Sequence, residues 1–153
     1  MAGKESRGVE SAEAGLFRGR PYVLTGGEPE LEKWIERIGA RLVILSAREH
    51  DRLVALTSHL PQLISTALAV SIADEPGAGR VAGPAAVDLT RLALSPHEIW
   101  RDIFATNSAP IDDALATFIA KLEKLRKTLK DPAIEQEFNA GAVLARSLRK
   151  EGS

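Results

Sequence analysis

The sequence predicts a mainly α-helical protein, in which a helical bundle follows a short strand-helix-strand segment. From Ser46 onward, apolar residues recur at helical spacing in long segments joined by short loops, which is typical of a bundle. Before Ser46, two short β-prone runs flank one helical segment. We therefore expect two domains, an α/β part over residues 1–45 and an all-helical part over residues 46–150.

The predicted strands are residues 22–25, closed by Gly26 and Gly27, and the more apolar residues 41–46. The helix between them is marked by apolar residues at helical spacing and by Gly39 as its stop. These apolar residues are Leu31, Trp34, Ile35 and Ile38. Because two strands do not make a stable sheet alone, we expect this pair to be the edge of a larger α/β layer.

The composition excludes several classes of function. Twenty basic and 21 acidic residues leave a net charge of −1, so no overall positive field would hold nucleic acid or an anionic membrane. Cysteine is absent and the three histidines are scattered, so we expect neither disulfides nor a metal site. The first 20 residues lack the apolar stretch of a secretory signal, which makes a cytoplasmic protein the default.

The bundle begins with an unusually apolar segment. Ser46 and Glu49 have the spacing of a capping box and predict the start of a long helix. Residues 53–73 contain no charged side chain and are long enough to cross a bilayer. Repeated polar residues, and Pro61 in the middle, favour a helix buried inside a bundle over a membrane span.

Three further helices are predicted after a loop at residues 74–79. Ser95 and Glu98 suggest a second capping box, with Pro96 at the first helical position. The pattern breaks at residues 107–110, and an amphipathic helix of about twenty residues then extends to Leu129. A weaker helix follows Asp131 and Pro132, and the basic residues before it are interpreted as a solvated face. These are Lys121, Lys124, Arg126, Lys127 and Lys130.

Polar residues of the apolar segment fall into one band. Its members are Asp51, Ser58, Gln62 and Ser65, together with Arg52, His59 and Thr66 at intervals of seven. A polar group in a bundle interior costs about 1–3 kcal/mol unless it is partnered, so the band predicts either hydrogen bonds to another helix or a wet ligand pocket. Pro61 interrupts the helical hydrogen bonds beside His59 and can turn a side chain toward a cavity.

Arg91 stands among apolar residues, three positions after Asp88. The two form either a surface ion pair, worth a few tenths of a kcal/mol, or part of a carboxylate-binding site, since a guanidinium can grip a carboxylate with two parallel hydrogen bonds. Trp100 is more simply a core residue. The sequence contains no G-x-G-x-x-G phosphate motif and no clear Ser-His-Asp arrangement.

Three strings occur in a specific order: HDRLVALTSHLP at residues 50–61, DLTR at 88–91, and IWRDIF at 99–104 followed by Asn107. Together they resemble the prephenate dehydrogenase family, which includes the arogenate dehydrogenases. The resemblance extends over nearly the whole chain but covers only the C-terminal part of such an enzyme. It implies that residues 1–45 are the end of a Rossmann-type nucleotide-binding domain and that residues 46–150 are a helical dimerisation and substrate-binding domain.

The same resemblance implies a homodimer in tyrosine biosynthesis that oxidatively decarboxylates prephenate or arogenate with NAD or NADP. The first residues, MAGKESRG, are similar to the family's loop H-P-M-A-G-x-E-x-x-G without its His-Pro. In the family, that histidine polarises the substrate hydroxyl as hydride leaves. We therefore expect this chain to lack the catalytic histidine and the cofactor motif, to be inactive alone, and to come from an interrupted gene or a late start codon.

The resemblance also implies a substrate pocket, with Arg91 binding a substrate carboxylate and His59 inside the pocket. Its residues would be Glu5, His59, Gln62, Asp88, Arg91 and Trp100. Asp88 and Trp100 would lie at the edge, reaching in from the partner subunit, and Glu5 would lie near the entrance. Gln62 stands where some members have a second histidine, which leaves prephenate and arogenate both open. The alternative is a noncatalytic helical dimerisation module, suggested by the long apolar helix and the missing cofactor motif.

Overall fold

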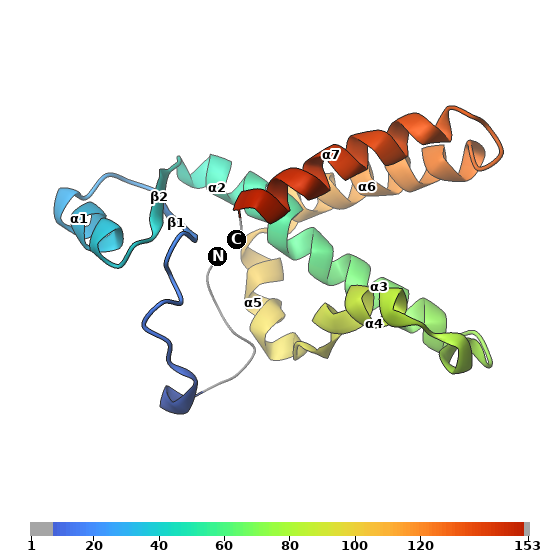
Figure 1. Ribbon diagram of the computed structural model, residues 1–153, viewed down its shortest axis with the longest axis horizontal. Coiled ribbons are helices and arrows are strands. Elements are labelled where there is room, and N and C mark those ends of the chain that lie inside the picture. The colour runs from blue at the N-terminus through green and yellow to red at the C-terminus, as the bar shows by residue number, and fades with distance from the viewer. Residues whose placement is uncertain (1–7, 152–153) are drawn as a thin grey trace. The chain divides into compact units, whose positions relative to one another are not determined.

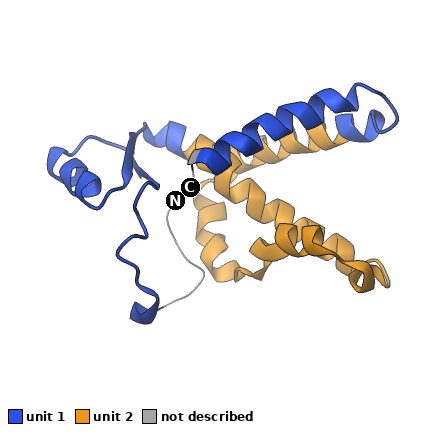
Figure 2. Ribbon diagram, in the orientation of Figure 1, with its two compact units in different colours: residues 1–50, 124–153 blue, residues 51–123 orange. Residues whose placement is uncertain are grey.

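The computed structural model describes residues 8–151 and is mainly α-helical, as predicted. The chain forms two compact units, residues 1–50 with 124–153 and residues 51–123 (Figure 2). Helices α2 (Ala47–Val54) and α6 (Ser108–Lys127) each run from one unit into the other. The predicted domain boundary at residue 45 stays a prediction.

The first unit contains the strand-helix-strand segment that the sequence predicted (Figure 1). Strand β1 (Pro21–Leu24) pairs in parallel with β2 (Arg41–Ile44), and helix α1 (Pro29–Arg37) connects them. A short 3₁₀ turn, η1 (Val9–Ser11), precedes β1, and the C-terminal helix α7 (Ile134–Glu151) belongs to the same unit. Two parallel strands joined by a crossover helix are the smallest piece of a parallel α/β sheet.

Local chemistry explains where α1 begins and ends. Pro29 lies in the first turn, where its missing N–H is not needed, and the Glu32 side chain accepts the backbone N–H of Glu28 at 3.0 Å. The helix stops at Gly39, whose φ of +78° favours glycine. Ile35 is 2% exposed and faces the interior of this unit.

The described residues of the second unit form helices joined by short turns and contain no strand. After α2 its elements are η2 (Ala55–His59), α3 (Leu60–Ala73), η3 (Ala78–Val81), α4 (Pro84–Thr90), η4 (Arg91–Leu94) and α5 (His97–Thr106), followed by α6. Both α4 and η4 lie against α3 (Figure 1). A buried cluster of Ala55, Leu60, Ile111 and Ala114 joins α3 to α6 and forms the apolar core of the unit.

One predicted capping box is confirmed and the other is wrong. At the start of α2, Glu49 N–H donates to Ser46 Oγ and Ser46 N–H donates to Glu49 Oε2, both at 3.2 Å. Helix α5 instead begins at His97, and no side chain in the described chain caps it. Ser95 lies one residue before the cap position, which Pro96 occupies, and its hydroxyl accepts the indole N–H of Trp100 at 2.9 Å.

The long apolar helix is continuous from Ala47 to Ala73 but changes its winding in the middle. Segment η2 is a π-helical turn, in which the Leu60 N–H donates to the Ala55 carbonyl five residues back. Pro61 follows directly and has no N–H to offer to the preceding turn. A π turn inserted into an α-helix shifts the residues after it around the axis, and such turns are frequent at functional sites.

Among the described residues, Ala47–Ala73 is also the one stretch long and apolar enough to cross a membrane, and an 18-residue window within it has a mean hydropathy of 1.4. The core helix of a bundle meets the same two criteria. Three polar side chains of this stretch, His59, Gln62 and Ser65, are buried within the unit. Length and composition therefore do not by themselves indicate a membrane span.

Candidate functional site

The predicted polar band of the long helix is buried at three of its positions. His59 is 7% exposed, Gln62 5% and Ser65 2%, whereas Arg52 and Thr66 are exposed. Each of the three buried side chains meets a segment that is distant in sequence. Of the two predictions for the band, hydrogen bonds within the bundle and a ligand pocket, the first therefore accounts for part of it.

His59 belongs to an aromatic group formed with α5. Its ring meets Trp100 edge to face, with centroids 6.1 Å apart, and Trp100 stacks on Phe104 at 5.7 Å. On its other side, His59 Nδ1 lies 3.2 Å from the side-chain nitrogen of Asn107. The structure thus brings together His59 and Trp100, two of the residues predicted for the pocket, and adds Asn107 to them.

Gln62 and Ser65 hold the η4 turn on α3. Gln62 Nε2 donates to the Leu92 carbonyl at 2.9 Å, and the Ala93 N–H donates to Ser65 Oγ at 3.0 Å. These two bonds fix the backbone directly after Arg91. The Gln62 Oε1 atom is buried and has no hydrogen-bond partner among the described residues, so it can still accept one bond.

The remaining predicted residues lie at the surface or outside the described chain. Arg91 begins η4 and Asp88 lies in α4, and both side chains are exposed. A guanidinium beside a fixed backbone segment has the chemistry of a carboxylate-binding group. Glu5 lies outside the described residues, so its predicted place at the entrance stays a prediction.

Sequence reasoning missed two partners in this region. In the sequence Asn107 stands out only as part of a string, and Ser95 only as a candidate helix cap. An asparagine at a break between two helices is a common polar cap, so its type alone gives no sign of a bond to a histidine 48 residues away. The buried serine Ser65 was predicted as part of the band but not as the acceptor for η4.

The described residues do not fit a dinucleotide cofactor. Parallel α/β sheets bind pyrophosphate at a glycine-rich turn that opens a helix after a strand. The corresponding turn here leads from β1 into α1, but the first residues of α1 and its cap include Glu28, Glu30 and Glu32. Glu32 already occupies the Glu28 N–H, and three carboxyl groups would repel a pyrophosphate. Elsewhere in the described part of the chain, as here, no three acidic or histidine side chains come together in a group that could hold a metal ion.

A family model described as "Prephenate dehydrogenase, dimerization domain" matches residues 46–142. The chain belongs to the prephenate dehydrogenase family. The resemblance seen in the three sequence strings is therefore confirmed, and this chain carries the family's dimerization domain.

Individual relatives support the same assignment. A cyclohexadienyl dehydrogenase from Zymomonas mobilis is 32% identical over 84% of this chain and 48% of its own length. The structure resembles that of Aquifex aeolicus prephenate dehydrogenase in complex with hydroxyphenyl propionate and NAD⁺, with a TM-score of 0.79, 27% identity, and coverage of 100% of this chain and 57% of that chain. It also resembles Synechocystis arogenate dehydrogenase, with a TM-score of 0.76, 25% identity, and coverage of 99% and 59%.

The chain spans less than half the length of the curated relatives that it matches, between 39% and 48%. These relatives are a cyclohexadienyl dehydrogenase and three prephenate dehydrogenases, one of them described as probable. Their names include more than one substrate. The substrate and the activity of this chain are therefore matters for a proposal.

Proposed function

We propose that this chain supplies the dimerisation surface and the substrate-binding side of a prephenate or arogenate dehydrogenase, an NAD- or NADP-dependent enzyme of tyrosine biosynthesis in the cytoplasm. The observation that carries the proposal is the clamp on η4, in which Gln62 and Ser65 fix the backbone beside Arg91 at 2.9 and 3.0 Å. A cation whose backbone is fixed loses less conformational freedom when it binds an anion. Prephenate and arogenate are both carboxylic acids.

Each predicted pocket residue has a role in this proposal. Arg91 binds a carboxylate of the substrate through its guanidinium. His59 and Trp100 form the wall against which the substrate ring packs, since aromatic rings offer a large apolar surface. Gln62 holds the backbone beside Arg91 in place, and Asp88 and Glu5 lie toward the edge and the entrance.

The chemistry of hydride transfer requires groups that the described residues do not offer. The acidic start of α1 does not fit the pyrophosphate of a nicotinamide cofactor, and the sequence contains no glycine-rich phosphate motif. We therefore expect no turnover of prephenate or arogenate by this chain alone, with either NAD or NADP. The residues described here bind and orient the substrate.

A homodimer fits the surface of the helical unit. Large apolar side chains remain exposed along several of its helices, among them Val87 at 64%, Leu89 at 62% and Leu94 at 85%. Val87 and Leu89 lie in α4 and Leu94 in the adjoining η4, which makes this part of the surface a candidate interface. A second copy of the chain would cover it, in agreement with the description of the matching family model as a dimerization domain.

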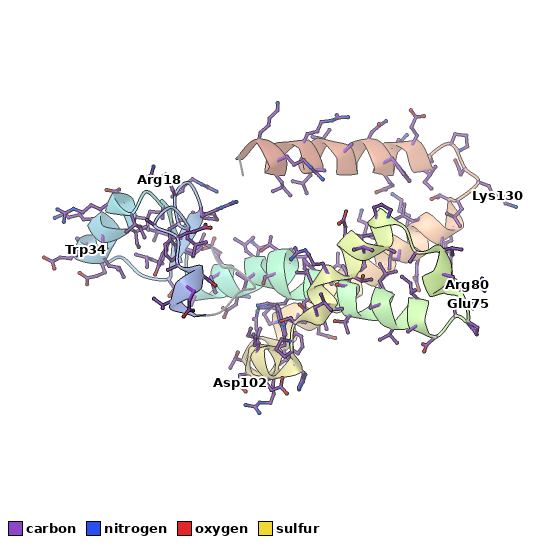
Figure 3. The ribbon with its side chains drawn as sticks, turned by 60° about the horizontal axis from the view of Figure 1, so that its bottom comes forward. Arg18, Trp34, Glu75, Arg80, Asp102 and Lys130 are labelled. Carbon is purple, nitrogen blue, oxygen red and sulfur yellow. The ribbon has the colours of Figure 1, made fainter. Side chains whose placement is uncertain are left out.

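Ligand binding to the purified chain tests the proposal. The probe is hydroxyphenylpropionate, the ligand named for the Aquifex aeolicus structure, and its affinity is measured by titration calorimetry. Arg91→Ala should weaken binding by one to two orders of magnitude, since a hydrogen bond to a charged group contributes about 1.5–3 kcal/mol. Arg80→Ala is the matched control, because Arg80 is an exposed arginine of η3, in the turn after α3 (Figure 3), and is not one of the predicted pocket residues.

The outcomes separate the proposal from its alternative. Binding that depends on Arg91 but not on Arg80 supports a substrate-binding role. A dimer that does not bind the probe would instead indicate the noncatalytic dimerisation module. Equal affinities for the wild type and Arg91→Ala would remove Arg91 from the site.

A further inference from the structure

Asn107 is buried at a fixed point between two helices. It caps the C-terminus of α5, where its N–H donates to the Ile103 carbonyl at 3.0 Å, and its own carbonyl accepts the Ile111 N–H at 3.2 Å. The residue is 7% exposed. Because the backbone is held on both sides, the side chain starts from a defined position and can place its amide precisely.

The amide nitrogen of Asn107 makes two contacts. It lies 2.9 Å from the carbonyl oxygen of Asp51 and 3.2 Å from Nδ1 of His59. A backbone carbonyl oxygen only accepts hydrogen bonds. The nitrogen must therefore occupy this place, because a reversed amide would set its oxygen against the Asp51 oxygen.

This orientation determines which nitrogen of His59 carries the proton. The Asn107 nitrogen offers only N–H donors, so His59 Nδ1 has to accept, and the neutral ring then carries its hydrogen on Nε2. We propose that Asn107 is a positioning residue that holds His59 in the Nε2–H tautomer, so that Nε2 of the imidazole can act only as a hydrogen-bond donor. The donor role toward the substrate rests on the proposed function, whereas the tautomer does not.

The tautomer specifies the chemistry that His59 can perform. An N–H group at Nε2 matches an oxygen acceptor, such as the carboxylate or carbonyl oxygen of an organic acid. The ring is also kept from turning by Trp100, which meets it edge to face at 6.1 Å. In this tautomer His59 would donate a hydrogen bond through Nε2 and would not take a proton from the substrate there.

The test is nuclear magnetic resonance of the whole chain labelled with ¹⁵N, with no ligand and no activity required. Long-range proton-nitrogen spectra report which imidazole nitrogen carries hydrogen, and His59→Asn assigns the ring against His50 and His97. We expect a protonated Nε2, a bare Nδ1, and a scalar coupling across the hydrogen bond between Asn107 Nδ2 and His59 Nδ1. Because free imidazole also favours Nε2–H, the coupling is the decisive signal.

A variant supplies the second measurement. In Asn107→Asp a carboxylate replaces the donor, so the hydrogen should move to Nδ1 of His59 or the ring should become protonated on both nitrogens. Asn139→Asp, at an exposed position of α7, makes the same change of charge and should leave the His59 spectrum as it is in the wild type. If Asn107→Asp does not fold, the scalar coupling between Asn107 and His59 in the wild type still tests the proposal.

Three results would overturn the inference: a wild-type ring that carries hydrogen on Nδ1, the absence of the coupling in a well-resolved spectrum, or an unchanged tautomer in folded Asn107→Asp. None of these results bears on whether Arg91 binds hydroxyphenylpropionate. Failure of the tautomer and failure of the proposed function are therefore distinguishable.

Discussion

Replacing Ser65 by alanine removes one of the two bonds that hold η4. The Ser65 hydroxyl is 2% exposed and accepts the Ala93 N–H at 3.0 Å. In Ser65→Ala this N–H faces a methyl group with little access for water. An unsatisfied buried donor costs about 1–3 kcal/mol, so the free energy of unfolding should fall by roughly that amount, less a gain of about 0.5 kcal/mol from alanine's helix propensity.

Ser71→Ala is the control for the gain in helix propensity that alanine brings. Ser71 lies in the same helix, is exposed, and within the described residues donates to the Ala67 carbonyl one turn back. The two variants therefore gain equally from alanine, and the difference between their unfolding free energies should be about 1–3 kcal/mol. Urea unfolding followed by circular dichroism measures it, at one protein concentration, since dimerisation contributes to stability.

Two readouts link this loss to the site. Hydrogen exchange of the Ala93 amide should become faster in Ser65→Ala and stay unchanged in Ser71→Ala. The affinity for hydroxyphenylpropionate should also fall in Ser65→Ala, because the backbone beside Arg91 is less well held. A difference in unfolding free energy below about 0.5 kcal/mol, with slow Ala93 exchange, would refute the clamp.

Two further predictions concern the caps and the assembly. Glu49→Ala should lower the free energy of unfolding by about 0.5–2 kcal/mol, because the Glu49 carboxylate accepts the Ser46 N–H. Glu98→Ala, at the predicted capping box that does not form, should change the free energy of unfolding by less than about 0.5 kcal/mol. The same urea assay measures both variants. Analytical ultracentrifugation should show a dimer at micromolar concentration; a folded monomer there would contradict both the proposed enzyme and the alternative dimerisation module.

The elements of the fold were largely predictable from local patterns. The two strands and α1 follow from β-prone runs around a helical repeat that ends at Gly39, and all these signals lie within a few residues of one another. The capping boxes show the limit of such patterns. Ser46 and Ser95 have the same spacing to a glutamate, but α2 begins directly after Ser46 whereas α5 begins two residues after Ser95, and the motif alone does not reveal this difference.

The candidate site was predictable by residue type and not by partner. The polar spacing in the long helix indicated His59, Gln62 and Ser65, because a polar side chain in an apolar helix needs a partner. Their partners lie 28 to 48 residues away, and sequence periodicity carries no information at that range. The π turn at residues 55–59 is equally hidden, since Pro61 predicts a disturbed helix without giving its form.

A crystal structure of this chain grown with hydroxyphenylpropionate tests the central claim most directly. We predict the carboxylate of the ligand within hydrogen-bonding distance of the Arg91 guanidinium and its ring against His59 and Trp100, in one subunit or across the dimer. A ligand bound elsewhere, with the Arg91 and His59 side chains facing unrelated surfaces in both copies, would contradict the account.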